Sequence, residues 1–288
     1  MRLRTTCLLA LVLMLMAGCS SLPRSPERVT ALDTRAATIY QAGLRQYREG
    51  RFAQSAICFE QTRALHASVD DRAGTAQALA SLGRARLALG ENDAAATAFQ
   101  RSLDAARGLG VPALEAEALG GLAAVALEQD RVDDARIWLA AGLALPLDDP
   151  SPERAVLLHD LGMALLQEGD AVAAEAHLRR ALAMHESLND ALGVAADCHS
   201  LAVLRAGAGD LDEAADLARR ALSRDKAEET PRGVAQDLSL LGRIAERRGE
   251  TVDAVGYFRR AELAWSARGD GEAAADVAAR IRWLQPTD

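Results

Sequence analysis

The sequence predicts an all-α protein, a right-handed α-solenoid of six helical hairpins followed by a C-terminal capping helix. Three observations predict this fold class. One pattern of small and bulky residues recurs at steps of 40, 40, 39, 40 and 40 residues. Apolar residues within each half-repeat recur at spacings of three and four, the period of an amphipathic helix. Aromatic residues make up only 3% of the chain, so its apolar content is mostly Ala and Leu, both strong helix formers.

Residues 1–18 are predicted to be a bacterial lipoprotein signal peptide. An apolar run from Cys7 to Ala17 follows a basic start and is too short for a bilayer span, which needs about 20 residues. The run ends in LMAGC at residues 15–19, which resembles the bacterial lipobox. That resemblance implies a lipidated Cys19, anchored permanently by three acyl chains, and Ser20 then favours the periplasmic face of the outer membrane. An ordinary secretory signal, with no role for Cys19, is the alternative.

Residues 19–32 are predicted to hold the lipidated cysteine and a short tether. The stretch SSLPRSPER is polar and contains two prolines, which suits a linker that holds the folded part off the lipid surface. Two other cysteines, Cys58 and Cys198, fall in the first and fifth repeats. A solenoid keeps these repeats apart, so we expect two buried free thiols and no disulfide.

Six repeats follow, at about residues 33–70, 71–110, 111–150, 151–189, 190–229 and 230–268. The first helix of each carries an aligned small residue, at Gly43, Gly83, Ala123, Gly162, Ala202 and Gly242. A helix stop comes seven residues later, at Gly50, Gly90, Asp130, Gly169, Gly209 and Gly249. The second helix has a small residue at Ser55, Ala95, Ala135, Ala174, Ala214 and Ala254, and a mostly bulky one at Phe59, Phe99, Leu139, Leu178, Ala218 and Phe258. Small residues let the two helices approach closely, and glycine ends a helix at little cost.

This pattern resembles the tetratricopeptide repeat over residues 33–268. The 40-residue period resembles the longer subclass of that family, whose junctions read like DDRAGTAQALASLG, Asp70–Gly83. The resemblance implies that the hairpins stack in order, because one hairpin alone cannot bury its apolar face. The third repeat departs from the pattern at Ala123 and Asp130, so its hairpin is expected to be the least regular.

Proline positions support the predicted helix starts. Pro112, Pro152 and Pro231 each lie ten or eleven residues before the aligned small residue, where a first helix should begin. The motif SPER occurs at 25–28 and at 151–154, in each case with a serine that can cap the helix.

Residues 269–288 are predicted to form a capping helix and a tail. The stretch GDGEAAADVAARIRWLQ begins like a seventh repeat and then stops. We expect Ile281 and Trp283 to cover the last open face of the solenoid.

The resemblance also implies a concave groove lined by the first helix of each hairpin. The candidate partner-binding residues there are Tyr40, Leu44, Tyr47, Arg84, Leu87, His159, Met163, Leu166, His199 and Arg243. This surface is apolar in its middle, which suits an amphipathic helix or an extended apolar segment of a partner. Tyr40 and Tyr47 are the best anchor candidates because tyrosine is enriched at binding hot spots. For the leucines, packing between adjacent first helices is the alternative.

Two histidines of the groove stand in equivalent positions of neighbouring repeats. His159 and His199 each lie three residues before the aligned small residue, so their imidazoles would line up about one repeat apart. They would form either a pH-sensitive contact or a chance pair of polar residues on an exposed surface. His177 and His185, eight residues apart, fit a helix with polar residues between leucines better than a metal site.

Charge and motifs exclude several function classes. The formal net charge is −8, or −10 (31 minus 41) once Arg2 and Arg4 are removed, which is the wrong sign for holding nucleic acid. The motifs HExxH, CxxC, GxSxG and a phosphate-binding loop are all absent from the sequence. We therefore expect no catalytic residues, no metal, no cofactor and no enzymatic activity.

The function expected from these features is that of a scaffold. An outer-membrane lipoprotein would present the groove to a periplasmic or outer-membrane protein or peptide. One version is pilotin-like, in which the protein helps an outer-membrane secretin or pilus component to assemble. A second version is a docking regulator of a cell-wall enzyme. A catalytic or metal-binding protein is the disfavoured third class.

Overall fold

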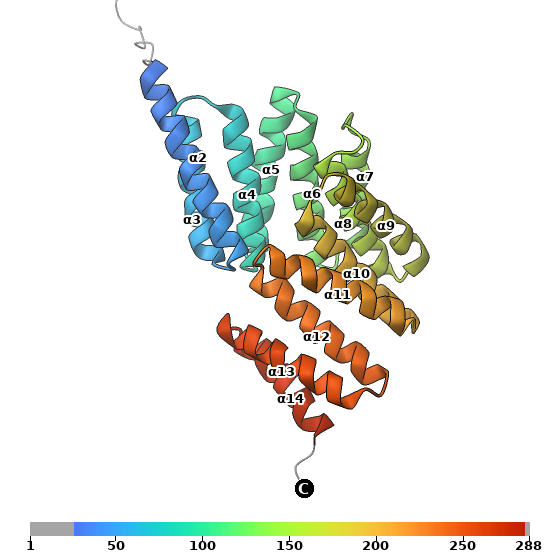
Figure 1. Cartoon of the computed structure of the whole chain (residues 1–288). Coiled ribbons are helices and arrows are strands. Elements are labelled where there is room, and N and C mark those ends of the chain that lie inside the picture. The colour runs from blue at the N-terminus through green and yellow to red at the C-terminus, as the bar shows by residue number, and fades with distance from the viewer. Residues whose placement is uncertain (1–25, 286–288) are drawn as a thin grey trace, which may run out of the picture.

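The computed structural model describes the backbone of residues 26–285 and the side chains of residues 31–285. That part of the chain forms thirteen α-helices and no strand (Figure 1). In chain order they are α2 (Pro26–Arg48), α3 (Phe52–Ser68), α4 (Arg72–Ala88), α5 (Asn92–Leu109), α6 (Pro112–Glu128), α7 (Val132–Leu143), α8 (Pro152–Glu168), α9 (Ala171–Ser187), α10 (Ala191–Ala208), α11 (Leu211–Ala227), α12 (Pro231–Arg247), α13 (Thr251–Ala267) and α14 (Gly271–Leu284). The predicted signal peptide and Cys19 lie outside the described residues.

The helices form the six predicted hairpins. The pairs α2–α3, α4–α5, α6–α7, α8–α9, α10–α11 and α12–α13 each pack together, and each hairpin packs on the next (Figure 1). Each buries only one face by itself, so a series of apolar clusters runs between neighbouring hairpins from Phe59 at one end to Val277 at the other. The predicted all-α solenoid is confirmed.

Close contact within the hairpins follows the predicted pairing of small and bulky residues. A Cβ atom added to Gly83 would lie 2.9 Å from the Phe99 ring, and one added to Gly242 would lie 2.5 Å from the Phe258 ring. The bulky side chain therefore occupies the space that the glycine leaves free.

The helix stops adopt left-handed backbone conformations. The five predicted glycines have φ between +76° and +91°, and Asp130 takes φ +55° at the degenerate third position. The turns between hairpins use the same device, with Asp70, Asn189 and Glu229 at φ +53° to +60°. Asp and Asn are enriched in this region, and Glu229 is the unusual member.

Three first helices begin at the prolines that predicted their starts, and the predicted tether needs one correction. Pro112, Pro152 and Pro231 are the first residues of α6, α8 and α12, and the Ser151 hydroxyl accepts a hydrogen bond from the Arg154 backbone N–H at 3.2 Å. However, α2 already begins at Pro26, so residues 26–32 of the predicted tether are helical. Proline in the first turn of a helix accounts for this early start.

The third hairpin is the least regular, as predicted. Its second helix, α7, has only 12 residues, while the other helices of the repeats have 17 or more. Pro146 follows closely, and proline cannot continue a helix because it lacks the N–H donor. Inside α7, Gly142 makes room for Leu157 of the next hairpin, whose Cδ1 would lie 2.9 Å from an added Cβ.

The last helix, α14, caps the solenoid, but not with both predicted residues. Ala274 and Val277 are buried against α12 and α13, with Ile281 and Leu284 partly buried beside them. Trp283 is 67% exposed, which corrects the prediction, and the Arg280 guanidinium lies 5.0 Å from the centre of its ring. The buried face is set by helical spacing, and Trp283 falls outside it.

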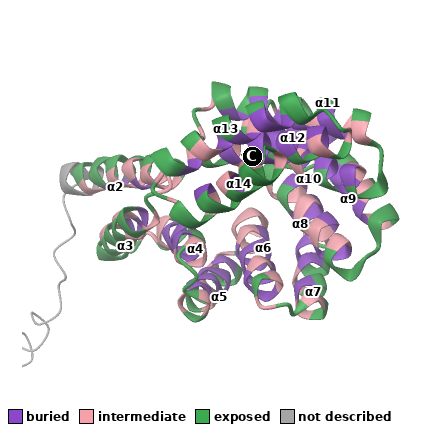
Figure 2. Ribbon diagram, turned by 90° about the horizontal axis from the view of Figure 1, so that it is seen from below, coloured by how far each residue is buried: buried purple, intermediate pink, exposed green. Residues whose placement is uncertain are grey.

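The hairpins wind so that their first helices lie on the inner side. Figure 2 shows α4, α6, α8 and α10 on this inner side, with α5, α7 and α9 outside them. The winding brings the two ends of the solenoid together: a Cβ added to Gly50, in the turn after α2, would lie 2.8 Å from Nη2 of Arg268, which follows α13. The inner surface is thus bounded by both the first and the sixth hairpin.

Candidate functional site

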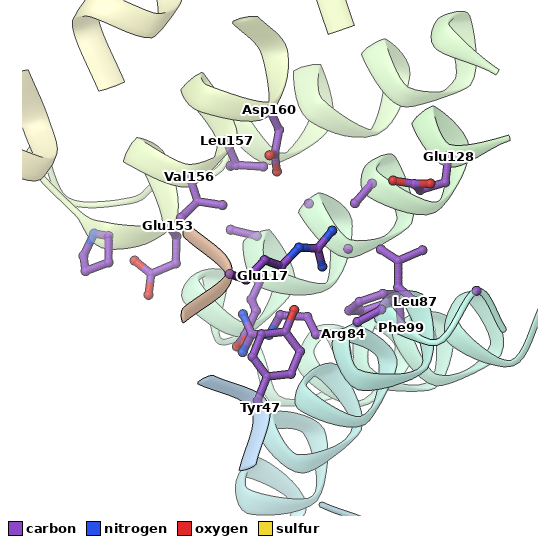
Figure 3. A pocket seen from close by; sticks show the side chains of 18 residues that line it. Tyr47, Arg84, Leu87, Phe99, Glu117, Glu128, Glu153, Val156, Leu157 and Asp160 are labelled. Carbon is purple, nitrogen blue, oxygen red and sulfur yellow. The ribbon is translucent and has the colours of Figure 1, made fainter. Parts of the chain in front are cut away.

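A cavity of about 720 Å³ lies on the inner surface of the solenoid (Figure 3). It is formed by the end of α2, by α4, α6 and α8, and by Arg232 at the start of α12. We call it the groove cavity. Its principal side chains are Tyr47, Arg84, Leu87, Glu117, Glu128, Glu153, Val156, Asp160 and Arg232.

Small residues on α6 create the depth of the groove cavity. Gly120, Gly121 and Ala124 lie on its wall. A Cβ added to Gly120 would meet only Leu157 Cδ2 at 3.5 Å and Asp160 Oδ2 at 3.8 Å, so the space in front of this glycine is open. Cavities of a few hundred Å³ that combine apolar walls with a few polar groups are typical binding sites.

A second cavity, of about 510 Å³, lies between α10, α12, α13 and α14. We call it the C-terminal cavity. His199, Ser239, Arg243, Trp265 and Arg280 are among its lining residues. The Trp265 indole N–H donates to the Ser239 hydroxyl at 3.1 Å, and Glu246 accepts two hydrogen bonds from Arg280 at 2.5 and 2.7 Å.

The structure divides the ten predicted groove residues between cavities and helix interfaces. Tyr47, Arg84 and Leu87 line the groove cavity, and His199 and Arg243 line the C-terminal cavity. The remaining five, which line neither cavity, are Tyr40, Leu44, His159, Met163 and Leu166.

These five pack against neighbouring helices. The Tyr40 hydroxyl is 2.9 Å from the Ser81 hydroxyl, with which it shares a hydrogen bond, and its ring centre is 5.4 Å from that of Phe59. Leu44 packs in the same cluster. Met163 and Leu166 pack in the cluster formed by α8, α9 and α10, as the alternative for the leucines proposed.

Three carboxylates that line the groove cavity were not predicted from the sequence. Glu117 lies six residues before the aligned Ala123, and Glu153 and Asp160 lie nine and two residues before the aligned Gly162, so none of the three is among the ten predicted groove residues. The sequence spacing could have identified two of them, because Glu153, Val156 and Asp160 follow the spacing i, i+3, i+7 that places residues on one helix face. Figure 3 shows Asp160 and Glu128 directed toward the same opening from α8 and α6.

The charges of this cavity are unevenly paired. Arg84 and Glu117 form an ion pair at 2.5 Å between α4 and α6. Within residues 31–285, Glu128, Glu153 and Asp160 make no hydrogen bond or ion pair. Burial raises the pKa of Asp160 to about 6, with His159 acting to lower it and Asp197 to raise it.

Behind Asp160 lies a buried chain of hydrogen bonds. Asp197 is fully buried, and its two carboxylate oxygens lie 2.6 Å from His159 Nδ1 and 2.6 Å from His185 Nδ1. Asp197 of the fifth repeat thereby joins both helices of the fourth. Burial lowers the pKa of His159, but the hydrogen bond to Asp197 and the charges of Asp160 and Asp197 outweigh burial, so the net pKa is raised.

One repeat further on, the arrangement recurs. His199 Nδ1 lies 2.6 Å from Asp237 Oδ1, and Thr230 donates to Asp225 at 2.5 Å. Burial raises the pKa of Asp237 to about 6, although the hydrogen bond and charge of His199 act to lower it. Both predicted histidines are therefore held by an aspartate of the following repeat.

The two cysteines of the described chain, Cys58 and Cys198, are free, as expected, but only Cys198 is buried. Burial raises the pKa of the Cys198 thiol to about 11, which keeps it protonated and unreactive. Cys58 is only half-buried. Among the described residues, no group of three or more His, Cys, Asp or Glu side chains is placed to hold a metal ion, and none of the helices has the length and hydropathy of a transmembrane span.

Solved structures share this fold. BtubC from P. vanneervenii is similar over 83% of this chain and 92% of its own, with 21% identity and a TM-score of 0.59. A Rap protein complexed with competence and sporulation factor is similar over 86% and 74%, with 15% identity and a TM-score of 0.62. PilW, a type IV pilus biogenesis factor, is similar over 79% and 92%, with 20% identity and a TM-score of 0.53.

Family models complete the comparison. Among proteins with curated descriptions, none matches the chain. Models of the tetratricopeptide repeat match residues 33–108, 114–187 and 153–227, and a second model of this repeat matches residues 199–273. These matches span most of the chain and all six hairpins, and the chain therefore belongs to the tetratricopeptide repeat family.

Proposed function

We propose that this protein is an outer-membrane-anchored periplasmic scaffold that binds a segment of a partner protein in the groove cavity. Tetratricopeptide repeat proteins bind protein or peptide partners, and the groove cavity is the single observation that carries the proposal. It joins four successive hairpins and combines an aromatic ring, aliphatic side chains and charges on one surface. The proposal assigns the chain no enzymatic activity.

The lipid anchor and the pilotin-like version of the function are each supported by a different observation. The lipobox resemblance at residues 15–19 supports lipidation of Cys19 and hence attachment to the outer membrane. Likeness in fold to PilW, a pilus biogenesis factor, favours the pilotin-like version, in which the protein assists assembly of a secretin or pilus component. Docking onto a cell-wall enzyme is the second version of the scaffold.

Site-specific photo-crosslinking in living cells tests the groove. A photoreactive amino acid replaces Tyr47 or Val156 in the groove cavity, and Val172 or Val252 outside it as matched controls. The control positions are 83% and 86% exposed, so they sample the general surroundings of the protein. We expect discrete adducts from the two groove positions only. The same adducts from all four positions would exclude the groove as the binding surface.

Two further measurements test the lipid anchor and the two versions of the scaffold function separately. Replacing Cys19 by serine should move the protein from the membrane fraction to the soluble periplasmic fraction, and continued membrane attachment would contradict lipidation at this residue. Deletion of the protein should remove secretin or pilus multimers in the pilotin-like version. Altered cell-wall crosslinking with normal multimers would instead support the second version.

A further inference from the structure

The groove cavity holds more negative charge than its own residues neutralise. Four carboxylates line it, from Glu117, Glu128, Glu153 and Asp160, against the two guanidinium groups of Arg84 and Arg232. Arg84 is already paired with Glu117. Within residues 31–285, three carboxylates therefore remain without a partner on the walls formed by α6 and α8, opposite Arg232 on α12, which also forms no ion pair there.

Asp160 is the most telling of these carboxylates. It is half-buried, and no donor in residues 31–285 forms a hydrogen bond with it. A carboxylate removed from water normally has a cation or several donors as partners, because burying an uncompensated charge is costly. Gly120 on the facing helix has no side chain to cover it, so the carboxylate stays open to the cavity (Figure 3).

The surroundings of Asp160 suit a long cationic side chain. Val156 and Leu87 provide aliphatic surface, and Tyr47 provides an aromatic ring at the edge of the same cavity. Arginine and lysine pack their methylene stems on such surface while the charged end reaches a carboxylate, and a cation also gains from contact with an aromatic face.

We propose that the groove cavity binds a segment of the partner that carries arginine or lysine side chains, which pair with Asp160, Glu153 and Glu128. This inference rests on the proposed function and specifies the chemistry of the partner. It differs from the apolar segment that the sequence favours, because the carboxylates on α8 and α6 give the groove its charge.

The pairing makes binding depend on pH in a defined direction. The charged groups around Asp160 are His159 and Asp197 behind it and the other charged residues that line the cavity, which are Glu153 on α8, Glu117 and Glu128 on α6, Arg84 on α4 and Arg232 on α12. A bound cation favours the ionised carboxylate, so it lowers the pKa of Asp160 from about 6. By linkage, the cationic segment binds more weakly as the pH falls through 6, because protonation of Asp160 then competes with binding.

Binding of labelled peptides to the purified soluble domain with Cys19 replaced tests the inference. The probes are fluorescein-labelled nonapeptides with a fixed Ala/Leu background, in which three variable positions hold Arg, Lys, citrulline or Glu. Citrulline keeps the shape of arginine but not its charge. We expect Arg and Lys peptides to bind at pH 7.5, and their affinity to fall about tenfold or more in the variants Asp160→Asn and Glu153→Gln. We also expect the wild-type affinity to weaken at pH 5 more than that of Asp160→Asn.

The matched control is Asp216→Asn. Asp216 lies on α11 outside both cavities, and its side chain is 80% exposed. This variant removes the same charge from the molecule and should bind Arg peptides like the wild type. Thermal melts confirm that all variants are folded.

Several results would overturn the inference. Citrulline or Glu peptides that bind as well as Arg peptides would do so, as would no binding of any probe, or equal affinities of the Asp160 and Asp216 variants. The photo-crosslinks at Tyr47 and Val156 distinguish the two proposals: if they persist, the groove binds a partner, and only the cationic character of its segment is wrong.

Discussion

At the scale of single residues, buried aspartates hold the C-terminal half of the solenoid together. Asp197 is enclosed by two histidines of the preceding repeat, and Asp237 by another histidine one repeat later. Neither aspartate was singled out from the sequence, since a polar residue in an amphipathic helix is usually assigned to the exposed face. The recurring pair was visible: an aspartate stands five residues before the aligned small residue in the fifth and sixth repeats only.

Loss of Asp197 should destabilise the fold strongly. In Asp197→Ala, His159 and His185 lose their common acceptor inside the protein, and removal of one partner from a buried charged contact typically costs about 3–5 kcal/mol. Urea denaturation measures the change in the free energy of unfolding. The control is Asp212→Ala, whose 96% exposed side chain pairs with Arg248, and which should change little. Equal effects of the two variants would show that the buried chain adds nothing.

Asp237 should make stability fall as the pH rises. Burial raises its folded-state pKa to about 6 from an ordinary value of 3.8, so between these values the folded state binds more protons than the unfolded state. The contribution is fully present below pH 3.8 and is lost by about pH 6, and it amounts to on the order of 1–3 kcal/mol.

The variant Asp237→Asn isolates this contribution. Asparagine resembles the protonated form and can still accept the hydrogen bond from His199. The difference in the free energy of unfolding between variant and wild type should therefore change between pH 4 and pH 6, in favour of the variant at the higher pH. A difference that stays constant over this range would contradict the raised pKa.

At the scale of the element, the spacing of residues predicted the hairpins correctly. The size of one side chain, Trp283, led to a wrong prediction for the capping helix α14. The aligned small residue, the helix stop and the bulky partner placed each hairpin because each position has one steric task. Trp283 was expected to cap the solenoid because it is large. Ala274, Val277, Ile281 and Leu284 lie at i, i+3, i+7 and i+10, which defines the buried face of α14 without it.

Two Gly-to-Ala substitutions should have opposite effects on stability. In Gly242→Ala the new Cβ would lie 2.5 Å from the Phe258 ring, so overpacking should cost about 1–3 kcal/mol. In Gly256→Ala nothing lies within 4 Å of the new atom, so higher helix propensity should stabilise by about 0.5–1 kcal/mol. Thermal unfolding of both variants shows whether each substitution raises or lowers the stability of the fold. Destabilisation by both would mean that close packing is not the task of Gly242.

Second-site replacement tests the mechanism of the first substitution. Phe258→Leu should recover part of the stability lost in Gly242→Ala, since it removes the ring that the new Cβ meets. If the double variant is as unstable as the sum of the two single variants, the helices do not meet at this pair.

At the scale of the whole molecule, the curvature of the stacked hairpins could not be predicted from a single sequence. Curvature is the sum of small rotations from one repeat to the next, and no residue pattern states their size. The contact between Gly50 and Arg268 and the placement of Arg232 in the groove cavity both depend on that sum. The first helices that line the groove were predicted, α12 included, but the position of its Arg232 in one cavity with residues of the first four hairpins was not.

The stacked hairpins form a groove, and we propose that its open space takes a partner segment. Gly120→Leu fills that space from α6, where an added Cβ meets nothing closer than 3.5 Å, and Gly256→Leu is the matched control on the exposed face of α13. The decisive measurement is the yield of the photo-crosslink from Tyr47 in each background, with melting temperatures confirming the fold. We expect a loss of the adduct in Gly120→Leu and a wild-type yield in Gly256→Leu, whereas an undiminished adduct in folded Gly120→Leu would show that the partner does not occupy this space.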